Sequence, residues 1–260
     1  MTFVEPFVGG GAMFFYMLQR FHNIRKVVIN DLNSNLTRAY TTIRNHPNDL
    51  IDRLAHLQEQ YLPLDEAGRQ SFFLRQREVF NQHPEDDIEN SALLIFLNRT
   101  CFNGLYRENS RGAFNVPHGR YARPLICDSE TIMADSEMLK KVIILNGDYT
   151  NTIDYLDSNT LFYLDPPYRP LNATSSFNSY TSEAFNDDEQ RRLKAFCDEI
   201  DQRHGRFMLS NSDGKSATPS DDFFDRLYDG YTIHRVQAAR AINSNAQKRG
   251  SISELLITNF

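Results

Sequence analysis

The sequence predicts an α/β fold in which helices alternate with the strands of a mostly parallel sheet. Residues 3–7, a glycine turn at 9–11 and an apolar helix over 12–18 form a strand–turn–helix unit, and residues 26–31 form the next strand. Short apolar runs predict further buried strands, at 141–145, 161–164 and 207–210. The chain closes with a predicted antiparallel pair, 231–237 and 254–259.

The composition is that of an ordinary globular protein, because 40% of the 260 residues are hydrophobic and 24% are charged. The three cysteines, Cys101, Cys127 and Cys197, are scattered along the chain and lack the spacing of a zinc site. No apolar run approaches the length of a membrane span, and no signal pattern opens the chain. We therefore expect a cytoplasmic monomer with no bound metal and no membrane partner.

The first strand–turn–helix unit has the features of a nucleoside site. A glycine turn lets a ligand approach bare backbone, and an acid about 20 residues later, at the end of the second strand, binds ribose hydroxyls. Asp31 occupies that place, and three consecutive glycines instead of alternating ones favour a single nucleoside over a dinucleotide. The alternative is that Asp31 caps a helix, although Asn33 is itself a good cap for a helix reaching about Asn45.

The middle of the chain, residues 47–128, has a different character and predicts an inserted domain between 1–46 and 129–260. It is polar and mostly helical to residue 100, after which residues 98–121 mix glycines, aromatics, arginines and asparagines without a period. Residues 99–123 hold five arginines and one acid, and residues 235–249 hold four basic residues and no acid. These two basic stretches indicate surfaces that contact phosphates, despite the net charge of −6 of the whole chain. The simpler alternative is that they are ordinary solvated surface.

The sequence Asp165-Pro166-Pro167-Tyr168 follows a buried strand, and its prolines end the hydrogen-bonded ladder. Asp165 and the Pro166 carbonyl can accept hydrogens from the exocyclic amine of a purine and so localise its lone pair. Tyr168 can stack on that base, which must first leave the duplex. A plain turn capped by Asp165 is the alternative. Asp148, at the end of another strand, can accept from the adenine amine of a cofactor.

Several motifs recur together in one known family. They are Phe3–Gly11, Asn30-Asp31, Leu97–Arg99, Phe102–Arg107, Phe114–Tyr121 and Asp165–Tyr168. In these motifs and in their order, the chain resembles the D12-class DNA adenine-N6 methyltransferases, most closely the Dam-type enzymes that methylate adenine in GATC. The resemblance implies a Rossmann-like sheet with one antiparallel strand, an inserted and mainly helical DNA-recognition domain, S-adenosylmethionine as methyl donor and double-stranded DNA as partner.

The resemblance also implies roles for single residues. The cofactor would be held by Glu5, Pro6, Phe7, Gly9, Gly11, Asp31, Asp148, Tyr149 and Asp165, and the flipped adenine by Asp165, Pro166, Pro167 and Tyr168. Phe102 matches an aromatic that enters the duplex, Asn103 lies beside it, and Leu105, Arg107 and Pro117 match residues that read the remaining bases. Phosphates would be contacted by Arg99, Arg120, Asn245, Lys248 and Arg249.

One departure from the family lies at the start of the chain. Family members carry further residues before the first strand, with a Gly-Gly-Lys motif that contacts the cofactor, whereas this sequence starts at Met1 within that strand. We expect weaker cofactor binding as a result, and a DNA-binding protein without catalysis is one alternative. An amine methyltransferase acting on RNA or protein is another, but those families lack the 97–121 stretch. A solitary enzyme and one paired with a restriction endonuclease both fit the sequence.

Overall fold

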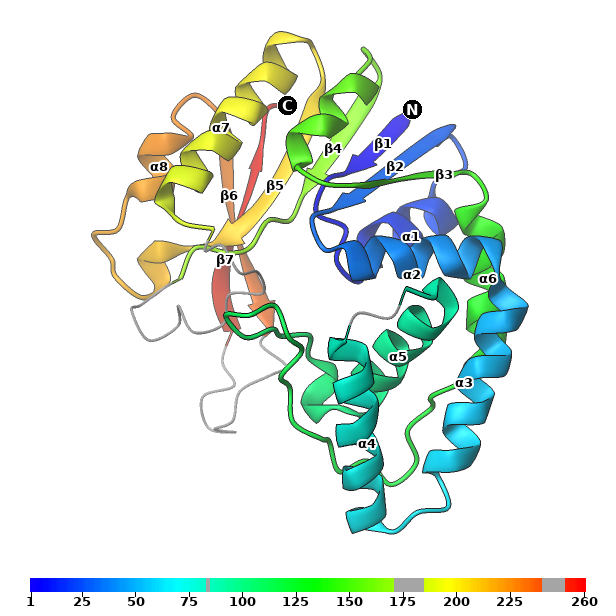
Figure 1. The fold of residues 1–260 in the computed structure, drawn as a ribbon. Helices are drawn as coiled ribbons and strands as arrows, with labels where there is room; N and C mark the ends of the chain where they lie inside the picture. Colours follow the sequence, from blue (N-terminus) through cyan, green and yellow to red (C-terminus); the bar gives the residue numbers. More distant parts are fainter. Residues whose placement is uncertain (83–84, 171–184, 240–250) are drawn as a thin grey trace. The chain divides into compact units, whose positions relative to one another are not determined.

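The computed structural model describes residues 1–82, 85–170, 185–239 and 251–260, and a seven-stranded sheet runs through it (Figure 1). The strands are β1 (Thr2–Glu5), β2 (Lys26–Asp31), β3 (Val142–Asn146), β4 (Thr160–Leu164), β5 (Arg206–Ser212), β6 (Thr232–Ala239) and β7 (Ser251–Thr258), in the order β3-β2-β1-β4-β5-β7-β6. β1 pairs in parallel with β2 and β4, and β4 with β5, whereas β7 is antiparallel to both β5 and β6. The predicted α/β fold with one antiparallel strand is confirmed.

Two helices lie close to the predicted bounds, 12–18 and the helix reaching about Asn45. The helices are α1 (Ala12–Arg20), α2 (Ser34–Asn45), α3 (Pro47–Tyr61), α4 (Glu66–Asn81), α5 (Asp87–Thr100), α6 (Ser129–Leu139), α7 (Asp187–Gln202) and α8 (Phe223–Leu227). Asn33 caps α2 as predicted, because its side chain accepts a hydrogen bond from the Asn35 amide at 3.0 Å. The sequence did not predict α6. No helix in the described part of the chain is long and apolar enough to cross a membrane.

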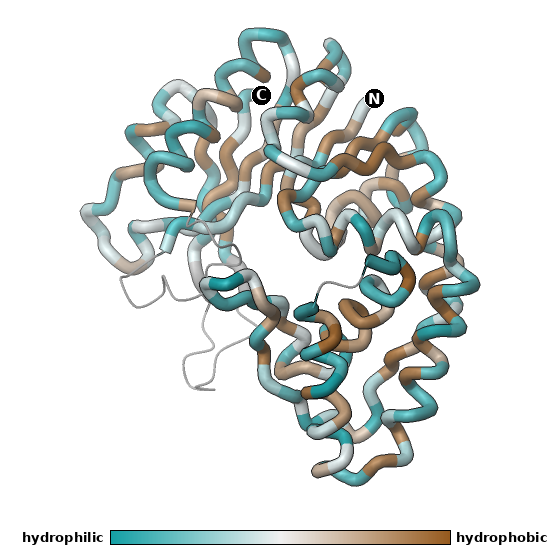
Figure 2. The backbone as a smooth tube through the Cα atoms, in the orientation of Figure 1, coloured by the Kyte–Doolittle hydropathy of each residue, from teal (hydrophilic) through white to brown (hydrophobic). Residues whose placement is uncertain are grey.

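Contacts divide the described residues into two compact units. The first unit holds residues 1–32, 147–170, 185–239 and 251–260, and the second holds residues 33–82 and 85–146. In the first unit β1 is buried along its whole length, as are Val27 to Asn30 of β2, and the hydrophobic colouring of Figure 2 follows these strands. Burial on both faces explains why the strands read as continuous apolar runs. The predicted limits of the inserted domain, 47 and 128, remain a prediction.

The second unit has a core of its own that anchors the irregular stretch after α5. Tyr61 is fully buried in that core, and its hydroxyl lies 2.7 Å from Nε2 of His118. The Phe102 amide donates to the Pro117 carbonyl at 2.9 Å, and the Gly119 amide donates to the carbonyl of Thr100 at 2.8 Å. The predicted loop is therefore fixed to the end of α5 by backbone bonds.

Replacing Gly119 by alanine should destabilise the second unit. A Cβ atom there would lie 2.6 Å from the Cys101 carbonyl oxygen, which is backbone and cannot move aside. We expect Gly119→Ala to lower the free energy of unfolding by about 1–3 kcal/mol, as overpacking does. Urea unfolding followed by circular dichroism measures this, with Gly10→Ala as control because no atom lies within 4 Å of a Cβ at Gly10. Equal midpoints for the two variants would contradict the expected clash.

Candidate active site

The carboxyl ends of β1 and β2 and the start of the segment after β3 are joined by one buried side chain. The Asn30 amide nitrogen donates to the carbonyls of Pro6 at 3.0 Å and Gly147 at 2.9 Å. Asp31 accepts from the Gly9 amide at 2.9 Å through Oδ2, and its own carbonyl accepts from the Gly147 amide at 3.1 Å. Three predicted binding segments thus meet in the first unit. The sequence assigned no role to Asn30, although a buried amide within an apolar strand was a signal.

A cavity of about 500 Å³ opens beside the glycine turn. It is lined by Glu5, Phe7, Val8, Gly9, Gly10, Gly11, Ala12, Met13, Tyr16, Tyr163 and Asp165. Gly9 and Gly11 have φ angles of 49° and 76°, a left-handed conformation that glycine adopts at no steric cost. The volume suits a nucleoside-sized ligand. Five predicted site residues therefore line one cavity. The other six, Val8, Gly10, Ala12, Met13, Tyr16 and Tyr163, were not predicted as site residues.

An aromatic pair and an acid continue the site. The Phe7 and Tyr149 rings lie 5.0 Å apart. Asp148 accepts from the Thr150 amide at 2.9 Å and from Arg192 at 2.8 Å, and the Arg192 guanidinium lies 4.9 Å from the centre of the Tyr149 ring. Burial opposes ionisation of Asp148, but the bonds from Thr150 and Arg192 prevail and lower the pKa of its carboxyl. Arg192 was missed because it is 44 residues distant in sequence from Asp148.

Glu5 is a buried acid in the cavity wall. Only 3% of its surface is exposed, and its Oε2 has no hydrogen-bond partner among the described residues. Burial, and then the negative charge of Asp165, raise the pKa of Glu5 to about 8. A cationic ligand group in the cavity would supply the missing partner and favour the ionised form.

The Asp165–Tyr168 corner lies directly after β4, at the carboxyl edge of the sheet. Asp165 is exposed and lines the cavity, and its Oδ1 accepts from the Ser210 hydroxyl at 2.5 Å. Tyr168 leaves 37% of its surface exposed, whereas Pro166 is buried. An exposed acid and ring on a fixed backbone can meet a flat, polar ligand.

The predicted DNA-contacting residues of the second unit lie on the stretch that begins at the end of α5. Arg99 and Pro117 are exposed, Phe102 is 51% exposed, and Asn103 has a left-handed φ of 55°. Leu105 is half-buried and packs against the core of this unit. The remaining predicted contacts, Asn245, Lys248 and Arg249, lie outside the described residues.

Two arginines of this stretch are held in different ways. Arg107 donates from Nε to Oδ1 of Asn115 at 2.7 Å, and the Asn115 amide donates back to the Arg107 carbonyl at 3.0 Å. Arg120 makes an ion pair of 3.2 Å with Glu66, and the two side chains are 85% and 69% exposed. Exposed pairs of this kind contribute little stability, so Arg120 can exchange its partner easily.

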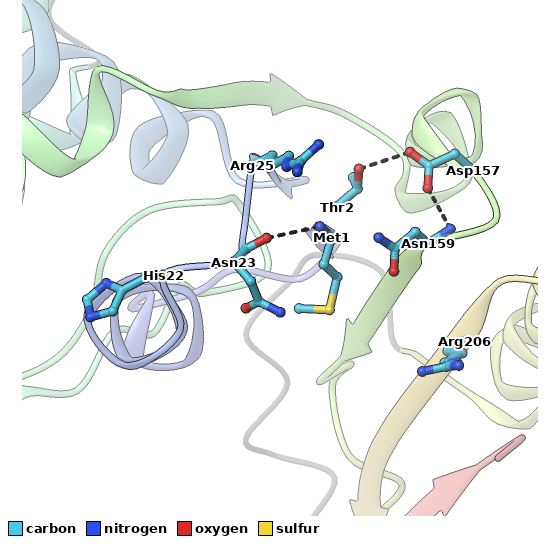
Figure 3. A pocket seen from close by; sticks show the side chains of 8 residues that line it. All are labelled: Met1, Thr2, His22, Asn23, Arg25, Asp157, Asn159 and Arg206. Atoms are coloured by element: carbon cyan, nitrogen blue, oxygen red, sulfur yellow. Dashed lines mark hydrogen bonds between the residues drawn. The ribbon is translucent and has the colours of Figure 1, made fainter.

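A larger cavity, of about 720 Å³, lies at the amino edge of the same sheet (Figure 3). Its walls come from Met1, Thr2, His22, Asn23, Arg25, Asp157, Asn159 and Arg206, none of them a predicted site residue. Asp157 accepts from the Thr2 hydroxyl at 3.0 Å and from the Asn159 amide at 2.8 Å. Its carboxylate therefore links the start of β1 to the segment that leads into β4. Ligands of open α/β sheets bind at the carboxyl edge, which favours the smaller cavity.

Known proteins resemble the chain over almost its whole length. The family model for D12 class N6 adenine-specific DNA methyltransferases matches residues 1–242. Type II methyltransferase M.MjaIII of Methanocaldococcus jannaschii is 45% identical over 99% of this chain and 88% of its own length. Type II methyltransferase M1.LlaDCHI of Lactococcus lactis subsp. cremoris is 37% identical over 99% and 86%. DNA adenine methylase of Escherichia coli K12 is 29% identical over 97% and 84%.

The buried acid of the cavity predicts a pH-dependent stability. Because its pKa is raised from 4.5 to about 8, Glu5 favours the folded state fully below pH 4.5 and loses that contribution as the pH rises to 8. Glu5→Gln should therefore match the parent at pH 4.5 and exceed its stability by a few kcal/mol at pH 9, at about 1.4 kcal/mol per pKa unit.

Chemical unfolding of the ligand-free protein at these two pH values tests this. Glu137→Gln controls for the loss of one charge, since Glu137 is an exposed acid that pairs with Lys140 at the surface. If the difference in unfolding free energy between Glu5→Gln and the parent is the same at pH 4.5 and pH 9, ionisation of Glu5 does not destabilise the fold and the expectation is wrong.

Proposed function

The chain belongs to the D12 class of N6 adenine-specific DNA methyltransferases, and we propose that its methyl donor is S-adenosylmethionine and its target is the adenine of GATC. DNA is thus its substrate, and adenine methylation its activity. The observation that carries the proposal is the shared cavity wall: Asp165 of the proline corner lines the same cavity as the glycine turn Gly9–Gly11. A methyl donor and an adenine amine must meet at one point, and that wall offers it.

The residues around the cavity fit S-adenosylmethionine chemically. This molecule carries a positive sulfonium and ammonium, and Glu5 offers a buried carboxyl whose Oε2 has no partner in the described structure. Asp31 would bind the ribose hydroxyls, while Phe7, Asp148 and Tyr149 would hold the adenine. The backbone of Pro6, Gly9 and Gly11 would border the ligand. When bound, the cofactor supplies an electrophilic methyl group.

The proline corner would act on the target amine. Asp165 accepts one amine hydrogen and the Pro166 carbonyl the other, which moves the nitrogen lone pair out of the ring system and makes it nucleophilic. Pro167 fixes the direction of the chain, and Tyr168, with its exposed ring, stacks on the flipped base. All of these groups lie on the fixed backbone of the corner, so none of them needs to move for methyl transfer.

The second unit would read the sequence around the target. Phe102 enters the duplex, with Asn103 beside it, and Leu105, Arg107 and Pro117 contact bases. Arg99 and Arg120 contact phosphates, as would Asn245, Lys248 and Arg249. Support for GATC comes from the likeness of residues 102–107 and 114–121 to Dam-type enzymes and from the 29% identity to the Escherichia coli DNA adenine methylase. Residues 47–128 would form the inserted recognition domain.

Two relatives are named type II methyltransferases, which supports a cognate restriction endonuclease as a partner. The DNA-specific family match weighs against an RNA or protein amine substrate. A catalytically inactive DNA-binding protein is the remaining alternative, and it differs from the proposal in one respect that can be measured, the binding of S-adenosylmethionine in calorimetry.

The proposed target and the role of Asp165 can be tested together. The parent protein with S-adenosylmethionine should protect unmethylated plasmid from a nuclease blocked by N6-methyladenine in GATC, and sensitise it to one that requires the methyl group. Asp165→Ala should lose roughly 10²–10³ in rate, as when one transition-state acceptor is removed. Its cofactor affinity should stay within a few fold.

The control is Asp154→Ala, which removes an exposed acid of the same unit outside the cavity. Adenine methylation at sites other than GATC would overturn the specificity alone. Turnover retained by Asp165→Ala would make Asp165 a turn residue only.

Alanine substitutions of Arg107 and Arg120 should change DNA binding in different ways. A bidentate arginine–guanine pair is worth about 1–3 kcal/mol of discrimination, so Arg107→Ala should relax the preference for guanine at one position with little change in salt dependence. Arg120→Ala should weaken binding to every sequence and flatten the salt slope by about one unit, as expected for a lost phosphate contact.

Binding to GATC and singly substituted duplexes at two salt concentrations separates these effects. Arg203→Ala, which removes an exposed arginine paired with Glu199 on α7, gives the baseline for loss of one charge. Uniform weakening by Arg107→Ala would reduce that residue to a backbone contact.

A further inference from the structure

Three consecutive residues of β5 form hydrogen bonds to residues of the proline corner or to Arg169, which follows it. The Ser212 hydroxyl donates to the Arg169 carbonyl at 2.6 Å, and Oδ1 of Asn211 accepts from the Arg169 amide at 3.0 Å. The Ser210 hydroxyl lies 2.5 Å from Oδ1 of Asp165. These three polar residues interrupt the apolar pattern of the strand, and each of their side chains forms a hydrogen bond with a residue between 165 and 169.

A second layer fixes the backbone between these contacts. Gln190 of α7 donates from Nε2 to the Pro167 carbonyl at 3.3 Å, and the Asn211 amide nitrogen donates to Oε1 of Gln190 at 3.2 Å. Both amide side chains are completely buried. Because buried amides keep their hydrogen bonds, the corner backbone is held without help from Asp165 or Ser210.

Ser210 therefore has a different task from its two neighbours, because it contacts the carboxylate itself. Ser210 is only 8% exposed, and its hydroxyl lies 3.2 Å from the Leu164 carbonyl as well as 2.5 Å from Oδ1 of Asp165. One hydroxyl proton serves one acceptor at a time, and 2.5 Å is the distance of a charge-assisted bond to a carboxylate. Asp165 is otherwise exposed, so this bond restricts its rotation.

We propose that Ser210 is a positioning residue for methyl transfer, which occupies Oδ1 of Asp165 so that Oδ2 is presented to the target amine. The inference rests on the proposed role of Asp165 as an acceptor for that amine. An acceptor already oriented before the reaction stabilises the transition state without reorganisation. Serine at this position thus contributes to the rate and not to the binding of DNA or cofactor.

The test compares Ser210→Ala and Ser210→Thr with the parent, using tritiated S-adenosylmethionine and unmethylated genomic DNA. Ser210→Ala should lower kcat roughly ten- to hundredfold, the scale of a misplaced catalytic group. The KM values for DNA and cofactor should stay within about threefold, because the substitution leaves unchanged the groups that bind the ground state and the transition state equally. Ser210→Thr keeps the hydroxyl in a residue that strands accept, and it should restore most of kcat.

Ser136→Ala is the matched control, because Ser136 is a buried serine whose hydroxyl donates to a carbonyl, that of Arg44, at 3.3 Å. Its thermal midpoint should match that of Ser210→Ala, with kcat unchanged. Full kcat in Ser210→Ala would overturn the inference. So would equal loss in the alanine and threonine variants, or a joint loss of kcat, KM and thermal stability. A parent that transfers no methyl group to adenine would instead overturn the proposed function.

Discussion

The buried Asn30 amide is the interaction on which the proposed cofactor site depends. Its nitrogen has two hydrogens, and both are used, one on the Pro6 carbonyl after β1 and one on the Gly147 carbonyl after β3. Strands alone place their ends in a row but do not fix the segments that follow them. A shorter or apolar side chain at position 30 would leave two carbonyls without this donor, at a cost of about 1–3 kcal/mol for the buried Pro6 carbonyl. The glycine turn and Asp148 are thereby held at a set separation.

Under the proposed function, the charge pattern of the cavity would let an acidic protein hold a cationic ligand near DNA. Glu5 and Asp165 repel each other, which helps to raise the pKa of Glu5, and a positive ligand between such groups would relieve that repulsion. The same acids do not favour phosphates. The arginines are concentrated in residues 99–123, away in sequence from the acids of the cavity. Binding of a cation and binding of phosphates would therefore use different parts of the chain, and the net charge of −6 need not oppose DNA binding.

Local patterns predicted much of the fold, and long-range contacts account for what they missed. Residues 26–31 and 34–45 form the predicted strand and helix because an apolar run and the Asn33 cap act within a few residues. The proline corner was found because Pro166 and Pro167 act on their own backbone. Ser210, 45 residues from Asp165, and Arg192, 44 residues from Asp148, carry no such local signal. Their partners are decided by which strands and helices become neighbours, and only the fold supplies that.

Arg107 and Arg120 differ in how much side-chain freedom each would lose in the proposed contacts with DNA. Fixing a long side chain costs up to about 2 kcal/mol of conformational entropy. Arg107 has already lost part of that freedom, because Asn115 holds its Nε and its backbone carbonyl. It can therefore present its remaining guanidinium donors to one base edge with little further ordering, which suits discrimination between bases. Arg120, exposed and paired loosely with Glu66, keeps its freedom and can follow a phosphate whose position varies with sequence. This difference in rigidity before binding supports the proposal that Arg107 reads a base and Arg120 contacts phosphate.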